Sequence, residues 1–212
     1  MVKLLYCHST GLSDEKFAEH LAALPLDMQT YISKFRLEKD KKQRLLARLM
    51  LRHCLIQTTG SDSLLAQWKT DDNAKPYLPG WFDFSIAHAG DVILFAYASE
   101  QVGVDVEEIS LIEYTSISDF FHYEEQAFIG QAGQDQGERF YAIWTKKEAA
   151  LKAMGRGLLD GLQQFSCVQE QVTYNDHTWH FYPFTVSKLY ACYLCTKKEE
   201  STIEAEEFTL AD

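Results

Sequence analysis

The segment Gly103-Val104-Asp105-Val106-Glu107 has the alternation expected of a β-strand with two unlike faces. With Val102 before it, valine occupies every second position. Successive side chains of a strand point to opposite sides of the sheet. We therefore expect the valines to be buried on one face and both carboxylates, Asp105 and Glu107, to lie on the other.

A second patterned segment follows about forty residues later and reads Trp144-Thr145-Lys146-Lys147-Glu148-Ala149-Ala150-Leu151-Lys152. Within it Trp144, Glu148 and Lys152 recur every four residues, which places them along one side of a helix. We expect this helix to span residues 138–154, with Gly155 and Gly157 ending it. An aromatic ring, a carboxylate and an ammonium group then share one helix face.

The rest of the chain alternates helical and strand patterns. Strands are expected at 3–7, 65–69, 81–88, 92–98, 101–107, 165–171, 178–184 and 189–195, and helices after Ser13 and at 40–58, 117–129 and 138–154. Each half runs from helices to strands, so we predict an α+β fold of two similar lobes. The expected divisions are a first lobe at 1–101, a second lobe carrying the acidic residues at 102–200, and a loosely held acidic tail at 201–212.

The composition favours a globular, cytoplasmic protein. The chain has 212 residues, a formal net charge of −11 and 46% hydrophobic residues, and no apolar run approaches the length of a membrane helix. The N-terminal residues lack the pattern of a secretory signal. The acidic balance argues against a nucleic-acid partner. Five scattered cysteines do not suggest a disulfide framework, and the Cys192/Cys195 pair is interpreted as two small apolar residues of a strand.

One region is nevertheless basic. Eight cationic side chains gather there: Lys34, Arg36, Lys39, Lys41, Lys42, Arg44, Arg48 and Arg52. Three of the arginines form a stripe at four-residue steps along the helix expected at 40–58. A local basic surface on an acidic protein suits a phosphate-rich small molecule or an acidic partner.

The two patterned segments resemble the signature of the Sfp-type 4'-phosphopantetheinyl transferases, G-(I/V)-D-(I/V)-E followed by W-(S/T)-x-K-E-(A/S)-x-x-K. Ala74-Lys75-Pro76-Tyr77 resembles the family's G-K-P segment, and Phe84-Ser85-Ile86-Ala87-His88-Ala89 resembles its F-(S/N)-x-S-H-S segment. Arg44 falls where the family has a coenzyme A contact. The resemblance covers residues from about 30 to 160. It implies the pseudo-dimeric two-lobed fold of that family.

The resemblance also implies a site and a reaction. Asp105, Glu107 and Glu148 would bind Mg²⁺ against the pyrophosphate of coenzyme A, and Lys152 would contact that pyrophosphate. Arg44, Lys75 and His88 would hold the phosphates of the adenosine half, the 3'-phosphate in particular. A serine of an apo acyl or peptidyl carrier protein would attack the β-phosphate. The products would be phosphopantetheinyl-serine and adenosine 3',5'-bisphosphate.

The group that accepts the serine proton has several candidates. Phe120-Phe121-His122-Tyr123-Glu124-Glu125 resembles the family segment that ends in a proposed catalytic glutamate, and the alignment favours Glu125. Glu124 is one residue away, and His122 belongs to the residue type whose unperturbed pKa is near neutrality. A water molecule is the remaining alternative. The resemblance thus gives Glu125, Glu148 and Lys152 as catalytic residues.

Several of these positions have simpler interpretations. Lys147 can be a solvated helix lysine, Trp144 a core residue, and His88 a buried histidine that continues the alternation of its strand. Ala87 and Ala89 stand where the family has serines, so two hydroxyls that help to orient phosphates are absent and weaker coenzyme A binding is one consequence.

Two other function classes compete with the transferase. One is a metal-dependent nucleotide pyrophosphohydrolase that uses the same acids, and the other is an inactive carrier-protein binding module. The two halves of the chain can form a cleft by themselves, so we expect a monomer. The sequence does not identify the carrier protein, its pathway, or the preference for Mg²⁺ over Mn²⁺.

Overall fold

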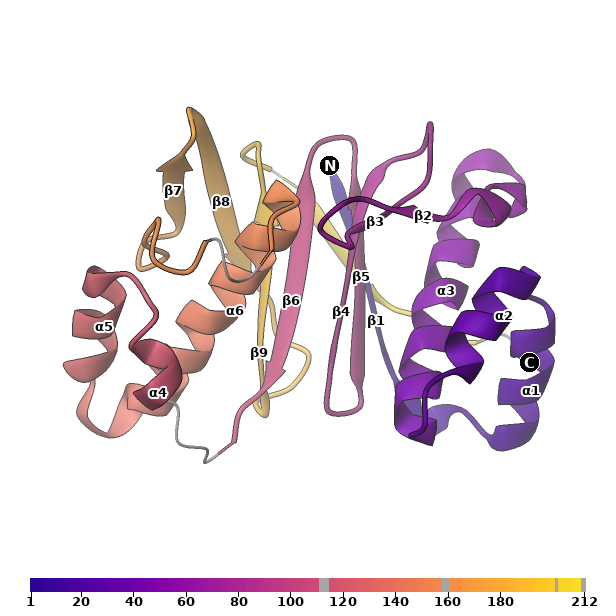
Figure 1. The fold of residues 1–212 in the computed structure, drawn as a ribbon, viewed down its shortest axis with the longest axis horizontal. Coiled ribbons are helices and arrows are strands. Elements are labelled where there is room, and N and C mark those ends of the chain that lie inside the picture. The colour runs from indigo at the N-terminus through magenta and orange to yellow at the C-terminus, as the bar shows by residue number, and fades with distance from the viewer. Residues whose placement is uncertain (111–114, 158–160, 201, 211–212) are drawn as a thin grey trace.

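Two sheets lie back to back in the middle of the molecule, and helices cover their outer faces (Figure 1). The structure is a computed structural model that describes residues 1–110, 115–157, 161–200 and 202–210. One sheet has the strand order β10-β1-β5-β4 and the other has the order β6-β9-β8-β7. The α+β class and the two similar lobes predicted from the sequence are confirmed.

The first lobe begins with a strand and continues with three helices and a hairpin. Its elements are β1 (Val2–His8), α1 (Asp14–Ala22), α2 (Leu26–Ser33), α3 (Glu38–Thr59), β2 (Lys69–Thr70), β3 (Pro76–Tyr77), β4 (Asp83–Ala89) and β5 (Val92–Ala98). The second lobe repeats this plan. Its elements are β6 (Val102–Glu108), α4 (Thr115–Ser118), α5 (Tyr123–Gly130), α6 (Gln136–Met154), β7 (Gln171–Tyr174), β8 (His177–Pro183) and β9 (Tyr190–Thr196).

In both lobes the first strand pairs antiparallel with the last strand of the lobe. β1 pairs with β5 and β6 pairs with β9, and in each case the next strand outward, β4 or β8, is the hairpin partner of that last strand. Each lobe therefore starts with a strand rather than with a helix, which corrects the expected order.

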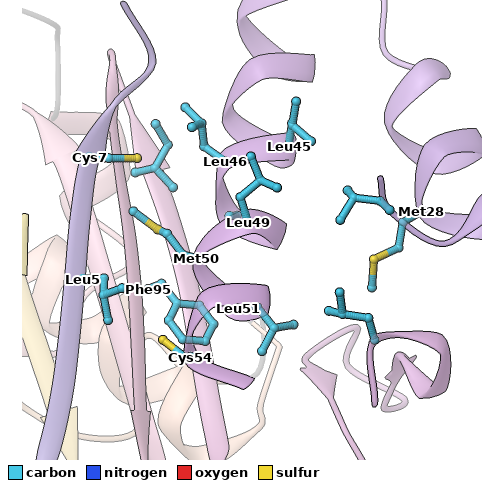
Figure 2. Close-up of a cluster of buried hydrophobic side chains, with 14 of the residues drawn as sticks. Leu5, Cys7, Met28, Leu45, Leu46, Leu49, Met50, Leu51, Cys54 and Phe95 are labelled. Atoms are coloured by element: carbon cyan, nitrogen blue, oxygen red, sulfur yellow. The ribbon is translucent and has the colours of Figure 1, made fainter. Parts of the chain in front are cut away.

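The long helix α3 fills the first lobe's core. Met50 and Cys54 point toward Leu5 and Phe95 of the sheet, while Met28 of α2 closes the opposite side (Figure 2). Acidic residues lie in the first turn of α3, where they interact favourably with the helix dipole. Gly60 ends the helix in the left-handed conformation, at φ 76°. The second lobe uses α6 in the same way, and Gly155 ends it at φ 64°.

A third apolar cluster joins the two sheets. The valines of β6, at positions 102, 104 and 106, pack with Ala87 of β4 and Leu94 of β5. Two side chains of β4 replace backbone pairing along this seam, since Asp83 accepts a hydrogen bond from the Val102 amide at 2.8 Å and Ser85 Oγ accepts one from Val104 at 3.1 Å. The seam fixes the two lobes against each other at the start of the predicted acidic strand.

Three expected elements were wrong. Residues 63–67 form a 3-10 helix rather than the start of a strand, with only Lys69–Thr70 extended. The helix expected at 117–129 is interrupted, because His122 caps a new helix, α5. The strand expected at 165–171 is absent and β7 begins at Gln171. The reason is that side chains elsewhere bind this backbone, Lys147 at Phe165 O and Glu125 at Cys167 N.

The C-terminal segment is also more ordered than a loosely held tail. β10 (Ile203–Glu207) pairs parallel with β1, with Val2 opposite Ile203 and Tyr6 opposite Glu207. Phe208 then donates its amide to Tyr6 O at 2.7 Å. The acidic residues of this segment therefore lie along the edge of the first lobe's sheet.

All five cysteines are free and buried, which confirms the interpretation of Cys192 and Cys195 as apolar strand residues. Among the described residues, no helix has the length and apolar character to cross a membrane.

Candidate active site

The acidic strand β6 and the helix α6 meet at a glycine. A Cβ atom on Gly103 would lie 1.9 Å from Ala149 O and 2.4 Å from Ala153 N, so only glycine allows this approach. The valines of β6 face the other sheet, and its carboxylates face α6, as the alternation predicts. The close packing brings Asp105 and Glu107 against the helix face that carries Trp144, Glu148 and Lys152.

Asp105 is the most deeply placed carboxylate of this group. Its Oδ1 accepts a hydrogen bond from Lys152 Nζ at 2.6 Å, whereas its Oδ2 is buried without a hydrogen-bond partner. Burial raises the pKa of the Asp105 carboxyl to about 7, and Lys152 opposes the rise. A buried carboxylate oxygen with no donor is costly, so the site lacks one positive or hydrogen-bonding partner.

Glu107 and Glu148 both lie close enough to Asp105 for their charges to raise its pKa further. Glu107 Oε1 accepts a hydrogen bond from Trp144 Nε1 at 2.8 Å, and the Trp144 ring stacks on Phe121 and Phe140. Core packing is therefore the role that the structure gives Trp144. Burial raises the pKa of Glu148, with Lys152 opposing and Glu107 adding to the rise. Three acids thus interact through one small region.

The donor set fits Mg²⁺ in the way that Mg²⁺ binds beside phosphates. In the part of the chain that the structure describes, no three His, Cys, Asp or Glu side chains form a ready-made metal cage. Mg²⁺ commonly uses only one or two carboxylates and completes its shell with water and substrate phosphates. The unpartnered Asp105 Oδ2, with Glu148 and Glu107 nearby, supplies those carboxylates.

Positive charge gathers in a cavity of about 670 Å³ next to this region. Arg44, Arg48 and His88 line it from α3 and β4, together with the rings of Tyr31 and Trp68. Desolvation against the cavity wall, and then the charges of Arg44 and Lys152, lower the pKa of His88. The His88 side chain still reaches the surface at this cavity, so the alternative of a buried histidine is wrong.

A second hollow of about 210 Å³ adjoins the first, sharing Ala74, Pro76 and Ile86 in its lining. Lys152 and Arg156 also line it, so it leads from the arginine cavity to the acidic site. A separate hollow of about 380 Å³ is lined by Glu107, Trp144 and Tyr141. Cations thus line the first two hollows, and Glu107 lines the third.

Lys75 lies at the seam between the lobes. Its ammonium forms an ion pair with Asp83 at 2.7 Å and donates to Val102 O at 3.2 Å, and its side chain is 13% exposed. Lys75 lines the second hollow, but its charge is already neutralised by a carboxylate. The structure thus brings together Asp105, Glu107, Glu148 and Lys152, and separately Arg44 and His88, with Lys75 between the groups as a structural cation.

Glu125 lies away from this cleft in a closed environment. It is fully buried and pairs with the equally buried Lys147 at 2.9 Å. Its two oxygens also accept from the backbone amides of His122 at 3.0 Å and Cys167 at 2.7 Å. Burial raises the pKa of the Glu125 carboxyl, and Lys147 opposes that rise. Lys147 is accordingly not a solvated lysine, and the geometry gives Glu125 no access to a substrate.

The two other side chains considered as the general base, His122 and Glu124, are not enclosed as Glu125 is. His122 is the N-cap of α5, and its Nδ1 accepts a hydrogen bond from the Glu124 amide at 3.4 Å. Glu124 is exposed on the first turn of that helix. Within the described residues, neither side chain forms a hydrogen bond or ion pair with the carboxylates of β6 and α6.

Ala87 and Ala89 lie on the face of β4 opposite His88, because side chains alternate along the strand. Ala87 is buried between the sheets. Hydroxyl groups at these positions would therefore point away from the cavity that His88 lines. The expected weakening of phosphate contacts does not follow from the alanines.

Sequence reasoning missed the importance of Arg48. The sequence shows it only as the middle of the arginine stripe, yet its side chain turns inward, is 8% exposed and lies over the rings of Trp68 and Tyr31 at 4.5 and 5.2 Å. A signal was available, since its neighbours Ala47 and Leu49 are apolar and an arginine between them lies at the edge of the buried face.

Comparison with known proteins links both halves of the chain to one family. Residues 101–201 match the family described as the 4'-phosphopantetheinyl transferase superfamily. Residues 12–101 match the family described as 4'-phosphopantetheinyl transferase, N-terminal. The two matches meet at residue 101, and together they include both the arginine cavity and the acidic site.

Individual relatives agree with these matches. The chain is 31% identical to 4'-phosphopantetheinyl transferase psf-1 of Bacillus pumilus over 63% of its length and 58% of the relative's. It is 32% identical to a phosphopantetheinyl transferase of Thraustochytrium over 68% of its length and 57% of the relative's. It is 25% identical to 4'-phosphopantetheinyl transferase Sfp of Bacillus subtilis over 73% of its length and 70% of the relative's. The chain thus spans little more than half the length of the first two of these relatives.

Proposed function

Because this chain belongs to the 4'-phosphopantetheinyl transferase superfamily, we propose that it transfers 4'-phosphopantetheine from coenzyme A to a serine of an apo acyl or peptidyl carrier protein. The observation that carries the proposal is a pair of adjoining, cation-lined hollows that ends at the lysine paired with Asp105. Arg44 and Arg48, which have no carboxylate partner among the described residues, line the first hollow, and Lys152, which pairs with Asp105, lines the second. Coenzyme A carries its 3'-phosphate and its pyrophosphate at separate points, which suits this pattern.

The proposed binding roles follow from position. Arg44 and His88 hold the phosphate of the adenosine half, and Lys152 contacts the pyrophosphate, since its side chain is 31% exposed and its ammonium lies beside Asp105. Asp105, Glu148 and Glu107 supply the carboxylates of a Mg²⁺ site. When Mg²⁺ is bound there, it neutralises charge that develops on the pyrophosphate. Lys75 stabilises the seam from which β6 starts.

In the proposed reaction the serine Oγ forms a bond to the β-phosphorus, and the bond from that phosphorus to the bridging oxygen breaks. The leaving group is adenosine 3',5'-bisphosphate, and the hydroxyl proton passes to a base. We assign the base role to Glu148, or to a water molecule that it holds, because Glu148 is only half-buried beside Lys152, whereas Glu125 is sealed by Lys147 and two amides. Lys152 stabilises negative charge on the leaving phosphate.

Intact-mass spectrometry of carrier proteins tests the proposal. Apo carriers from fatty-acid, polyketide and nonribosomal-peptide systems are incubated with coenzyme A, Mg²⁺ and the enzyme. We expect at least one carrier to gain the mass of a phosphopantetheine group and a carrier lacking the serine to gain none. No gain on any carrier would contradict the proposal.

The competing enzyme is a pyrophosphohydrolase that uses the same acids. Incubating coenzyme A without a carrier distinguishes the two reactions, since a hydrolase releases adenosine 3',5'-bisphosphate while the transferase leaves coenzyme A intact. An inactive binding module would retain a carrier on a column without changing its mass.

We also propose that residues 1–101 and 102–200 act as two lobes around one cleft, and that the chain works as a monomer. The lining of the hollows comes from both halves of one chain, since α3 and β4 line the first hollow and β4 and the end of α6 line the second. Size-exclusion chromatography with light scattering measures this directly. A trimer would contradict the proposal.

A further inference from the structure

A side chain of the second lobe is anchored in the turn between β4 and β5 of the first. The Tyr190 hydroxyl, on the first residue of β9, donates a hydrogen bond to Asp91 Oδ1 at 2.7 Å and accepts one from the Asp91 amide at 3.3 Å. A Cβ atom on Gly90 would lie 2.2 Å from the Tyr190 hydroxyl oxygen. The tyrosine therefore fits against the turn because residue 90 is glycine.

The turn is itself fixed to the rest of the first lobe. Gln43 of α3 is buried, and its Nε2 donates a hydrogen bond to Gly90 O at 2.9 Å. The Asp91 carbonyl accepts a hydrogen bond from the Ser9 amide at 2.8 Å, and Asp91 Oδ2 lies 3.1 Å from His8 Nδ1. The position of the turn is thus fixed relative to α3, the helix that lines the arginine cavity.

Tyr190 is also close to the acidic strand. In the pairing of β9 with β6, Tyr190 lies opposite Glu108, and the next residue, Ala191, lies opposite Glu107. The end of β6 and the β4–β5 turn lie at the same, lower end of the two sheets in Figure 1. A short series of contacts through Asp91 and Tyr190 therefore connects the arginine cavity of the first lobe with Glu107 of the second.

This end of the seam between the lobes depends on a directional contact. At the other end, Asp83 and Ser85 of β4 accept hydrogen bonds from the backbone of β6. Near the turn, the packing of the seam is incomplete, because Ala89, Gly90 and Glu107 line a hollow of about 380 Å³ there. Apolar contacts are not directional. A hydrogen bond has a preferred distance and angle, so the contact of Tyr190 with Asp91 restricts rotation of one lobe against the other.

We propose that Tyr190 is a positioning residue, which holds the two lobes in the register that coenzyme A bridges. This inference rests on the proposed function, in which the first lobe holds the phosphate of the adenosine half and the second lobe contacts the pyrophosphate. Without the Tyr190 contact, the ligand itself must align the two lobes when it binds. Part of its binding energy is then used for that alignment, and its affinity falls.

Steady-state kinetics of Tyr190→Phe test the inference, because this change removes the hydroxyl and keeps the ring. We expect the KM for coenzyme A to rise about threefold to tenfold, the effect of one lost hydrogen bond. The kcat should change by less than about twofold, since bound coenzyme A aligns the lobes. Tyr182→Phe is the matched control. Tyr182 lies on β8, and its hydroxyl accepts a hydrogen bond from the Glu200 amide at 2.8 Å, away from the turn.

A ligand that contacts one lobe separates alignment from local damage. Adenosine 3'-monophosphate carries only the phosphate that the first lobe holds, so its affinity should be the same for Tyr190→Phe and the unmodified protein. An equal loss of affinity for this ligand would mean that Tyr190 shapes the first lobe alone. An unchanged KM for coenzyme A with a lowered melting temperature would mean that Tyr190 only stabilises the fold. Either result overturns the inference.

A double-mutant cycle shows whether Tyr190 acts through Asp91. Asp91→Ala should raise the KM for coenzyme A as Tyr190→Phe does, and the double variant should be no worse than Asp91→Ala. Asp91→Asn keeps an oxygen that accepts the Tyr190 hydroxyl, so its KM should stay within about twofold of the unmodified protein's. Additive losses in the cycle, or an Asp91→Asn variant as impaired as Asp91→Ala, would contradict the inference.

Spin labels on the two lobes test the alignment without a ligand. The five native cysteines are buried, so Glu19→Cys and Glu138→Cys, at exposed positions on α1 and α6, can be labelled selectively. Pulsed electron resonance should give a broader distribution of distances between the labels in Tyr190→Phe than in the otherwise unmodified protein. Equal distributions would contradict the inference. If coenzyme A does not bind the unmodified protein, the proposed function fails, while this ligand-free comparison still decides whether Tyr190 aligns the lobes.

Discussion

Two lysines on α6 form ion pairs with buried carboxylates, and the two pairs differ in how completely they are enclosed. Lys147 and Glu125 are fully buried, with 2.9 Å between their charged atoms, and three backbone groups complete their hydrogen bonds. Lys152 and Asp105 lie 2.6 Å apart, but the lysine is 31% exposed and Asp105 Oδ2 has no partner. The first pair is closed and the second is open.

The difference separates stability from chemistry. In the closed pair every polar atom is satisfied within the protein, so no group remains to bind a ligand. Removing one partner would leave the other as a buried, unpaired charge. In the open pair an acceptor oxygen and an accessible ammonium remain for groups from outside. We therefore expect changes at the closed pair to affect folding and changes at the open pair to affect the reaction.

The largest expected effect is at the closed pair. Glu125→Ala leaves Lys147 charged and buried and removes the acceptor of the His122 amide at the start of α5, so the free energy of unfolding should fall by about 3–5 kcal/mol. Urea denaturation measures the loss. Glu124→Ala, one residue away and exposed, is the control and should change stability by less than about 0.5 kcal/mol. Similar losses for the two variants would show that the pair is not closed.

At the open pair, Asp105→Asn should lower the transfer rate about 100- to 1000-fold, the usual cost of removing one electrostatic contact from a reacting centre. The amide still accepts the Lys152 hydrogen bond and removes a charge that burial disfavours, so the melting temperature should stay the same or rise. Initial rates by intact mass and a thermal melt check both parts. A large loss of stability with an unchanged rate would reverse the assigned roles.

Gly103→Ala should lower both the stability of the protein and the transfer rate. Its Cβ would meet backbone atoms of α6 at 1.9 and 2.4 Å, so the helix must shift relative to β6. We expect about 1–3 kcal/mol of destabilisation, with a reduced rate because Glu148 and Lys152 move with the helix. Gly130→Ala is the matched control, since its added Cβ meets nothing within 4 Å. An unperturbed Gly103→Ala variant would contradict the close packing of the site.

The smallest expected effect is on the pH dependence of coenzyme A affinity, through His88 in the arginine cavity. Desolvation, Arg44 and Lys152 lower the pKa of His88, and a phosphate beside it should raise that pKa. The contribution of protonated His88 to affinity is fully present below the pKa that His88 has without ligand. It is lost as the pH rises through the higher pKa that His88 has in the complex. A difference of about 0.5 between the two pKa values corresponds to about a threefold change in affinity.

Coenzyme A titrations of the unmodified protein and of His88→Gln isolate this contribution. They are compared across a range of about pH 5.5–8, which brackets the usual pKa of histidine. We expect the affinity of the unmodified protein to fall more steeply with rising pH than that of the variant. Parallel curves would exclude a contact between the phosphate and His88.

The acidic strand and its helix could be predicted from the sequence because their contacts follow local periodicity. Alternation placed Asp105 and Glu107 on one face of β6, and four-residue spacing placed Glu148 and Lys152 on one face of α6. Gly155 ended its helix as expected, because glycine adopts the left-handed conformation at low cost.

What the sequence did not predict depends on partners far apart in the chain. Lys147 has the pattern of a surface lysine until Glu125 and Phe165 O enclose it. The backbone at 165–167 carries a strand-like sequence, but these side chains take its hydrogen bonds. β10 pairs with β1 across nearly the whole chain. Periodicity within a segment contains no information about such long-range pairings. Whether an ion pair is closed or open depends on these pairings.

The most direct test measures carrier modification by intact mass for Glu125→Gln and Asp105→Asn at a temperature where circular dichroism shows both variants folded. We predict that Glu125→Gln retains the rate of the unmodified protein per folded molecule within about threefold, whereas Asp105→Asn loses at least about 100-fold. A folded Glu125→Gln variant that loses as much as Asp105→Asn would contradict the division between the closed and the open pair.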